Sequence, residues 1–390
     1  MKKSIALLFG VFLLIHAAQA KNVIVGAERI DQYLSLLKGK SVGLVVNQTS
    51  VIGSTHLLDT LLSLGIDVEL VFAPEHGFRG TADAGEHVSN GVDPKTKTAI
   101  VSLYGDNKKP KPGQLKDLDM LVFDIQDVGV RFYTYISTLQ YVMEACAENN
   151  KPLVILDRPN PNGHYVDGPV LDTQYRSFVG MQPIPVVHGM TIGEYAKMLN
   201  GEKWLDNEEQ CTLTVIPCLN YDHKTFYALP VKPSPNLPNM TAIYLYPSLC
   251  FFEGTNNVSL GRGTEKPFQI YGSDLFPDNL PYSFTPKSMD GAKNPPLLDK
   301  QCFGYDLSNI PLDTLRKQKF TLKYLLNAYK LSSDRSKFFN SFFIKLSGKG
   351  SLRVQTEKGL SEKSIKLSWK VQLAQFKEIR KKYLLYKDFE

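Results

Sequence analysis

The sequence has few cysteines, no nucleotide-binding motif and no long hydrophobic run after its first twenty residues. Five cysteines are too few for a disulfide scaffold, so we expect them to be mostly buried, with a Cys211 to Cys218 bridge as the alternative. A GxGxxG loop after a strand and a Walker A motif are both missing, which argues against a nucleotide cofactor. No later segment approaches the roughly 20 apolar residues of a membrane helix, so we expect no stable membrane insertion.

The chain also has no strong excess of one charge. Its 45 Lys and Arg against 39 Asp and Glu give a formal net charge of +6, which does not indicate a nucleic-acid partner. The basic excess lies in residues 341–390, with twelve Lys or Arg against five Asp or Glu. Such a run is usually a solvated face, and attraction to an anionic polymer is the alternative.

The first twenty residues, MKKSIALLFGVFLLIHAAQA, have the layout of an export signal. Lys2 and Lys3 precede an apolar run, and the segment ends in the small-x-small sequence Ala18, Gln19, Ala20. We therefore predict a signal peptide at residues 1–20 and a secreted protein, with the periplasm as its expected location.

The first half of the remaining chain alternates short apolar runs with segments of helical spacing. The apolar runs predict strands at residues 41–47, 68–73, 99–103, 120–125 and 153–157. Runs that are apolar throughout are typical of parallel strands covered on both faces. Residues 54–65 and 134–150 have helical spacing, and Ser54 or Thr55 could cap the first of these helices. We predict an α/β fold whose residues 21–210 form a Rossmann-like, doubly wound, mostly parallel sheet.

The pattern changes after about residue 210 to Pro-rich loops, apolar runs and helices. This predicts a second, smaller α+β domain at residues 211–390. Its last element should be an amphipathic helix that packs through Trp369, Leu373, Phe376, Ile379 and Tyr383.

Polar residues follow the predicted strands at the edge where open α/β sheets bind ligands. These candidate substrate-binding residues are Asn47, His76, Arg79, Asp124, Gln126, Arg131, Tyr133 and Asn160. Ordinary turn residues are the alternative, since the segment DRPNPNG is also a good turn sequence.

Glu75 is the sharpest candidate for a catalytic residue. It follows an apolar strand and enters a Gly-containing turn, where partial burial would suit a general acid. An ion pair with Arg79 or His76 is the alternative. Glu86 and Asp127 are candidates for a second catalytic carboxylate, because two carboxylates are the usual device for cleaving a sugar linkage.

Arg131 and Arg262 are candidate clamps for a carboxylate, because a guanidinium can donate two parallel hydrogen bonds to one. An internal ion pair is an equal alternative for each. The segment GMTIG has the form of a nucleophile elbow, yet Thr191 and Glu194 predict a helix-capping box there. Metal ligation by Asp124 and histidines has no supporting spacing, so we predict no metal and no cofactor.

Six ordered segments resemble one known family. They are FAPEHGFRGTADAGE, FDIQDVGVRFYTYISTL, LDRPNPNGHYVDGPVLD, PVVHGMTIGEYA, PSPNLPN and EGTNNVSLGRGTEKPF. Across about residues 25–310 the chain resembles the exo-acting β-N-acetylmuramidase family, formerly catalogued as a domain of unknown function.

The resemblance implies a Rossmann-like domain and a smaller domain with the active cleft between them. It also implies release of N-acetylmuramic acid from the non-reducing ends of peptidoglycan-derived disaccharides or glycan fragments. The Glu of the PEHG segment is the proposed catalytic acid in that family, which corresponds to Glu75. An arginine such as Arg131 or Arg262 would bind the lactyl carboxylate of the sugar, and Asn236 and Glu253 would belong to loops that close the pocket.

Two other functions stay open at this point. One is a metal-dependent cell-wall amidase or deacetylase that uses the histidines. The other is a non-catalytic periplasmic glycan-binding protein, because a two-domain α/β cleft also describes solute receptors.

Overall fold

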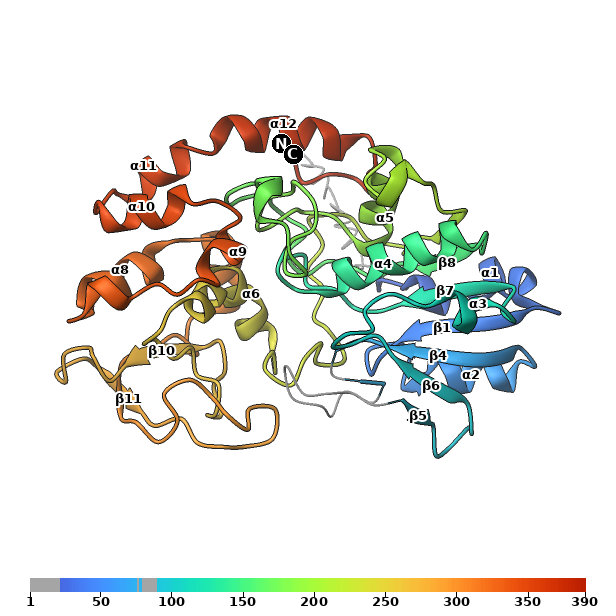
Figure 1. Cartoon of the computed structure of the whole chain (residues 1–390), viewed down its shortest axis with the longest axis horizontal. Helices are drawn as coiled ribbons and strands as arrows, with labels where there is room; N and C mark the ends of the chain where they lie inside the picture. Colours follow the sequence, from blue (N-terminus) through green and yellow to red (C-terminus); the bar gives the residue numbers. More distant parts are fainter. Residues whose placement is uncertain (1–21, 76, 79–89) are drawn as a thin grey trace, which may run out of the picture.

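The computed structural model describes residues 22–75, 77–78 and 90–390, so the predicted signal peptide lies outside the described residues. Within the described chain, seven strands form one sheet in the order β5-β6-β4-β1-β7-β8-β9 (Figure 1). The strands are β1 (Ser41–Val46), β4 (Asp67–Ala73), β5 (Gly91–Val92), β6 (Ala99–Ser102), β7 (Met120–Asp124), β8 (Leu153–Leu156) and β9 (Leu213–Ile216). Only the edge pair β5 and β6 is antiparallel among these neighbours. The mostly parallel α/β sheet is confirmed, and all five predicted strands lie within one residue of the observed bounds.

Two apolar clusters cover the two faces of this sheet, because successive side chains of a strand point to opposite faces. Phe123 and Ile155 pack in the cluster that contains α4 (Tyr135–Glu148) and α5 (Ile192–Gly201). Their neighbours in sequence, Val122, Val154 and Leu156, pack in the cluster of α1 (Ile30–Leu37) and α2 (Leu57–Ser63). Burial on both faces explains why the strand sequences are apolar throughout.

The predicted cap of α2 is wrong. Thr55 and His56 form strand β3 (Thr55–His56), which pairs with β2 (Val51–Ile52) in a hairpin. The helix therefore begins at Leu57, and the His56 imidazole Nδ1 accepts a hydrogen bond from the amide of Leu58 at 3.2 Å. The hairpin removes Ser54 and Thr55 from the capping position.

The second half of the chain contains a smaller sheet and a series of helices, as predicted. Its strands β10 (Ile270–Ser273), β11 (Tyr282–Phe284) and β12 (Cys302–Asp306) form an antiparallel sheet in the order β10-β12-β11. Its helices are α6 (Met240–Leu249), α7 (Leu312–Gln318), α8 (Lys323–Leu331), α9 (Phe343–Ser347), α10 (Ser351–Glu357), α11 (Glu362–Leu367) and α12 (Lys370–Lys381). The boundary predicted at residue 210 falls too early, because β9 pairs with β8 and so still belongs to the large sheet.

Helix α12 returns the chain from the second half to the first, where it approaches α5 (Figure 1). Trp369 and Phe376 are buried and pack with Leu373, Ile379 and Tyr383, so the predicted amphipathic helix is confirmed. The guanidinium of Arg380, buried in this contact, donates to the carbonyl of Gly189.

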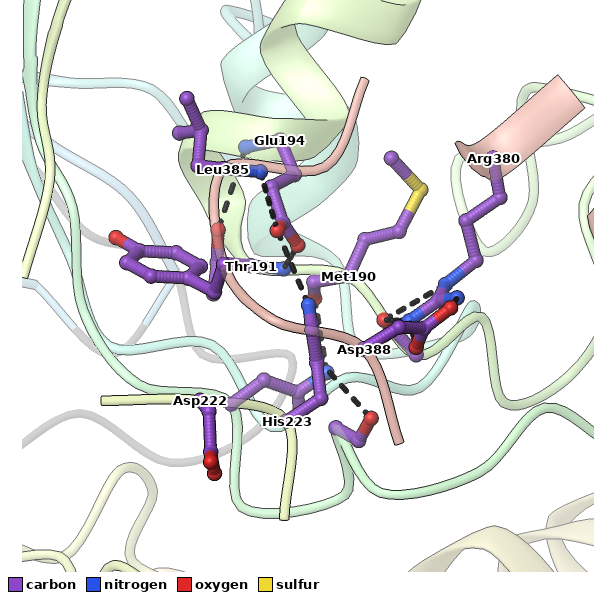
Figure 2. Close-up of polar contacts among 12 residues, drawn as sticks. Met190, Thr191, Glu194, Asp222, His223, Arg380, Leu385 and Asp388 are labelled. Carbon is purple, nitrogen blue, oxygen red and sulfur yellow. Dashed lines mark hydrogen bonds and ion pairs between the residues drawn. The ribbon is translucent and has the colours of Figure 1, made fainter. Parts of the chain in front are cut away.

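The segment after α12 docks on a buried carboxylate. Figure 2 shows Glu194, at the start of α5, with Leu385 and His223 around its side chain. Glu194 Oε1 accepts from the amide of Leu385 at 2.9 Å and lies 3.0 Å from His223 Nε2. Its Oε2 accepts from the amide of Thr191, whose hydroxyl accepts in turn from the Glu194 amide. The predicted capping box is therefore confirmed, and it also anchors the C-terminal segment.

Two further expectations can be compared with the described chain. All five cysteines are free and buried, so Cys211 and Cys218 form no bridge. Over residues 22–75, 77–78 and 90–390, no helix combines the length and the apolar character needed to span a bilayer.

Candidate active site

A cavity of about 210 Å³ lies between the two halves of the chain, beyond the carboxyl end of β4. From the first half it is lined by Glu75, Phe132, Tyr133, Thr134, Tyr135 and Val179. From the second half its main lining residues are Asn236, Tyr246, Glu253, Arg262, Phe268 and Phe342. The structure thus brings five of the predicted site residues to one cavity: Glu75, Tyr133, Asn236, Glu253 and Arg262.

Glu75 is half-buried on the cavity wall, next to the start of α4. The hydroxyl of Thr134 donates to Glu75 Oε2 at 3.1 Å, and the hydroxyl of Tyr135 lies 3.5 Å from the Glu75 carbonyl oxygen. Thr134 occupies the N-cap of α4, where a threonine hydroxyl commonly accepts a hydrogen bond from the helix. Here its side chain makes no capping bond within the helix, and the hydroxyl is directed to Glu75 instead.

The opposite wall carries a charged pair. Arg262 donates from Nε and Nη2 to the same oxygen of Glu253, Oε1, at 3.0 and 2.5 Å. Burial lowers the pKa of Arg262, but the charge of Glu253 and these hydrogen bonds outweigh it and leave the pKa raised. The guanidinium also lies 5.1 Å from the centre of the Phe268 ring. These contacts hold Arg262 in one orientation at the cavity.

The loop around Arg262 requires a glycine at position 261, directly before the arginine. Gly261 has φ of +88°, and a Cβ there would lie 2.5 Å from the carbonyl oxygen of Lys266. Phe268 has φ of +56°, which is uncommon for a non-glycine residue. Such strain persists only where the surrounding structure determines it, and it concentrates at functional sites.

Aromatic side chains line the cavity between Glu75 on one side and the Glu253–Arg262 pair on the other. Tyr133 packs edge-to-face on Tyr135 and Tyr246, with ring centres 4.9 and 5.8 Å apart, and Tyr246 packs on Phe268 at 5.0 Å. The Tyr133 hydroxyl donates to the carbonyl of Pro233 at 2.8 Å. Burial raises the pKa of Tyr133, Tyr135 and Tyr246, so these phenols are neutral near pH 7.

The prediction that Arg131 clamps a substrate carboxylate is wrong. Its side chain is fully buried, and its guanidinium donates to the carbonyls of Pro169, Ile184 and Leu346 at 2.7, 2.8 and 2.7 Å. Desolvation lowers the pKa of Arg131 to about 9. With these three acceptors around it, the guanidinium faces protein backbone, and Arg131 is not among the residues that line the cavity.

Asp124 is also internal. It is fully buried and forms a two-pronged ion pair with Arg158, with Oδ1 to Nε at 2.5 Å and Oδ2 to Nη2 at 2.9 Å. Both carboxylate oxygens are therefore occupied by a partner 34 residues further along the chain.

Three predicted amides stabilise turns rather than face the cavity. Asn47 Oδ1 accepts from the amide and hydroxyl of Thr49, and Gln126 Nε2 donates to the carbonyls of Asp127 and Pro159. Asn160 Nδ2 donates to the carbonyl of Met190. All three are buried, so the alternative of ordinary turn residues describes them better than substrate binding.

Asp127 is likewise buried and held by an internal contact. Its Oδ2 accepts from the amide of Gly129 at 2.6 Å, and the residue is 5% exposed and not part of the cavity lining. Desolvation raises the pKa of Asp127 to about 7, although hydrogen bonds from the amides of Gly129 and Val128 oppose the shift. A catalytic role as second carboxylate is not supported by this position.

Three predicted residues, His76, Arg79 and Glu86, lie outside the described residues. Thr134 and Phe342 line the cavity but were not predicted. Thr134 directly precedes a segment with helical spacing, and this position could have indicated it. No sequence pattern indicates Phe342, which lies at the start of α9 and reaches the cavity only through the tertiary fold. In the described part of the chain, no group of three or more His, Cys, Asp or Glu side chains is arranged to hold a metal ion.

Known proteins resemble this chain along most of its length. The chain matches two family models, described as Exo-beta-N-acetylmuramidase NamZ, N-terminal, at residues 42–241 and Exo-beta-N-acetylmuramidase NamZ, C-terminal, at residues 244–386. It is 40% identical over 375 residues to peptidoglycan beta-N-acetylmuramidase NamZ from Bacillus subtilis (strain 168), covering 92% of this chain and 89% of that protein. The fold and these matches are those of an exo-acting glycosidase. Within that class, the chain belongs to the exo-beta-N-acetylmuramidase NamZ family.

Two solved structures support the fold. One DUF1343 family protein from Bacteroides fragilis NCTC 9343 has 50% sequence identity and a TM-score of 0.88, over 94% of this chain and all of that chain. A second from the same organism has 29% identity and a TM-score of 0.78, over 94% of this chain and 99% of that one. The resemblance and the fold class predicted from the sequence are thus confirmed.

We expect Asp127→Asn to change the pH dependence of stability while kcat stays within about threefold. The pKa of Asp127 is about 7 in the folded chain and about 4 when unfolded, so its stabilising effect is complete below about pH 4 and is lost as pH rises through 7. Between pH 4 and pH 8 the native protein should lose more unfolding free energy than the variant, by about 1.4 kcal/mol for each pKa unit. Urea denaturation at both pH values measures this difference, and equal losses would contradict it.

Proposed function

We propose that this protein releases N-acetylmuramic acid from the non-reducing ends of peptidoglycan fragments, with Glu75 as the general acid. The observation that carries the proposal is the position of Glu75 on a small cavity whose far wall is formed by Glu253 and Arg262. The printed name of the Bacillus subtilis relative, a peptidoglycan beta-N-acetylmuramidase, supports the substrate class.

The size of the cavity supports attack at a chain end. Its volume of about 210 Å³ is below the roughly 300–1,000 Å³ of clefts that enclose drug-sized ligands. Such a space suits one terminal sugar rather than the interior of a glycan chain. Side chains from both halves of the protein line it, so the sugar would be enclosed between them.

Glu75 would protonate the oxygen of the glycosidic bond as the bond to the anomeric carbon breaks, so that the remaining glycan leaves as an alcohol. The Glu75 carboxylate that remains then takes a proton from the water whose oxygen adds to the anomeric carbon, which regenerates the acid. Thr134 would act as a positioning residue, because its hydroxyl donates to Oε2 and so fixes the orientation of the carboxyl group.

Arg262 is the predicted carboxylate clamp that reaches the cavity, since Arg131 is held by backbone carbonyls. Glu253 engages Nε and Nη2 of Arg262, which leaves Nη1 without an acceptor among the described residues. A lactyl carboxylate could bind this free edge, and a sugar without the lactyl group would leave it unpaired. Arg262 would therefore favour muramic acid over N-acetylglucosamine.

We further propose that the protein is exported to the periplasm. The support is the N-terminal sequence, with its basic start, apolar run and small-x-small end. Mass spectrometry of the exported protein should find a mature N-terminus at Lys21, and a retained Met1 would contradict export by this signal.

Replacing Glu75 should lower turnover by orders of magnitude and leave the fold intact. Glu75→Gln keeps an oxygen that can accept from Thr134 but has no proton to donate, so we expect kcat to fall by about 10²- to 10⁴-fold. Chromatography of the products from a MurNAc-GlcNAc disaccharide measures the rate.

Asp127→Asn is the matched control, because Asp127 is a buried carboxylate away from the cavity. A Glu75→Gln variant with native turnover would remove Glu75 from the mechanism. The same assay with a chelator tests the amidase or deacetylase alternative, which requires loss of activity and recovery with added metal. Binding without any product would favour the glycan-binding alternative.

The role of Thr134 can be separated from a structural one. Thr134→Val has the same shape without the hydroxyl, so we expect kcat to fall about tenfold or more while KM changes less than threefold, because the acid is misplaced but the sugar still binds. Thr134→Ser should restore kcat to near the native value. Steady-state kinetics on the disaccharide measures both, and a Val variant with native kcat would contradict the role.

A further inference from the structure

The active cavity has one exposed aromatic side chain that the mechanism above does not use. Phe342, the N-cap residue of α9, lines the cavity and is 37% exposed. The other aromatic residues of the lining are at most 8% exposed, and they are Phe132, Tyr133, Tyr135, Tyr246 and Phe268. These five rings form the inner part of the cavity, whereas Phe342 lies where the cavity opens to solvent.

Partial exposure also shows which other residues surround the mouth of the cavity. They are half-buried, whereas the rest of the lining is buried, and they are Glu75, Thr134, Val179, Glu253 and Arg262. Because Glu75 is the proposed acid and lies at the mouth, the glycosidic oxygen that it protonates must lie there too. The terminal sugar then occupies the inner part of the cavity, and the leaving sugar lies on the outer side of that oxygen, near Phe342.

The polar side chains at the mouth already have partners. Thr134 donates to Glu75, and Glu253 holds Arg262, whose free edge we assign to the lactyl carboxylate of the terminal sugar. Val179 and Phe342 are the mouth residues that remain for the leaving sugar, and both are apolar. N-acetylglucosamine has no charge, so an apolar contact suits it.

The ring of Phe342 is available to a ligand. Its neighbour Phe343 is buried and packs on Phe339 and Phe251, with ring centres 4.3 and 5.8 Å apart. Phe342 takes no part in this packing, and its ring has no aromatic or cationic partner among the described residues. A flat apolar ring exposed in this way can stack on the C–H face of a sugar.

The backbone of Phe342 is fixed to the wall that carries the charged pair. The amide of Phe342 donates to Asn340 Oδ1 at 2.8 Å. The side-chain amide of Asn340 donates in turn to the carbonyls of Glu253 and Thr255, at 3.3 and 3.1 Å. Phe342 therefore has a defined position relative to Glu253.

Helix α9 is also fixed to the half of the chain that carries Glu75. The carbonyl of Leu346 accepts from the guanidinium of Arg131 at 2.7 Å, and the carbonyl of Gly348 accepts from the amide of Asp172 at 2.9 Å. A ring at the start of this helix is thus held in place before substrate binds, which lowers the entropy cost of the contact.

We propose that Phe342 is a specificity-determining residue for the leaving sugar, with its ring stacked on the N-acetylglucosamine unit that follows the scissile bond. The inference rests on the proposed function for the identity of the two sugars. It adds a contact on the leaving side of the bond, where the mechanism above names no binding residue.

The test compares the KM for a MurNAc-GlcNAc disaccharide with the inhibition constant of free N-acetylmuramic acid, which lacks the leaving sugar. Phe342→Ala should raise the KM about three- to tenfold, the range expected for one aromatic contact, and leave the inhibition constant within about twofold. Phe342→Tyr keeps the ring and should keep the native KM. Phe342→Leu removes the flat ring from an apolar side chain and should also raise the KM, which provides a second variant if Phe342→Ala does not fold.

Phe226→Ala is the matched control. Phe226 is also an exposed phenylalanine, at 47%, but it is not among the residues that line the cavity. Its replacement should leave both the KM and the inhibition constant at their native values.

A Phe342→Ala variant with the native KM would overturn the inference. An equal rise of the KM and the inhibition constant would also overturn it, because the ring would then contact the terminal sugar. In both cases the native enzyme still cleaves the disaccharide, so the proposed function would survive. Failure of the native enzyme to cleave the disaccharide would instead contradict the proposed function.

Discussion

The arrangement of the active cavity depends on a buried guanidinium that joins the two halves of the chain. Arg131 donates to Pro169 and Ile184 in the first half and to Leu346 in α9 of the second. Its sequence neighbours Phe132 and Tyr133 line the cavity, and so does Phe342 at the start of α9. Burial without a carboxylate partner among the described residues is costly, as the lowered pKa of Arg131 shows, so these three carbonyls are needed to hold the charge. The same contacts fix the distance between the two cavity walls.

The C-terminal segment provides a second tie between the halves. The guanidinium of Arg380, in α12, donates to the carbonyl of Gly189. The amide of Leu385 donates to the carboxylate of Glu194 at the start of α5. The Tyr386 hydroxyl donates to Asp157, at the end of β8, at 2.6 Å. The second half is therefore held against the first at two places, through Arg131 and through the C-terminal segment. A site with walls from both halves can keep its geometry only if both ties hold.

The sequence predicts the sheet well and the roles of its polar residues poorly, for one physical reason. A strand buried on both faces is mostly apolar, so the signal is local, and five of the seven strands in the sheet were predicted; the two edge strands β5 and β9 were not. The role of a charged residue depends on partners that are distant in sequence. Asp124 and Glu75 both lie at the carboxyl ends of apolar strands. Asp124 forms a buried ion pair with Arg158, whereas Glu75 accepts a hydrogen bond from the Thr134 hydroxyl and lines a cavity. Arg131 and Arg262 were likewise equal candidates until their acceptors were known, three carbonyls in one case and Glu253 in the other.

The charges on the cavity walls give the glycan a direction. Arg262 keeps one edge free while Glu253 takes the other, so an anionic sugar can bind beside Glu75 without displacing an existing contact. In a glycan that alternates carboxylate-bearing and neutral sugars, this places the carboxylate-bearing terminal sugar in the cavity and makes the neutral sugar that follows it the leaving group. Because the cavity is too small for a second sugar beyond that end, the same placement explains why cleavage would proceed from the terminus.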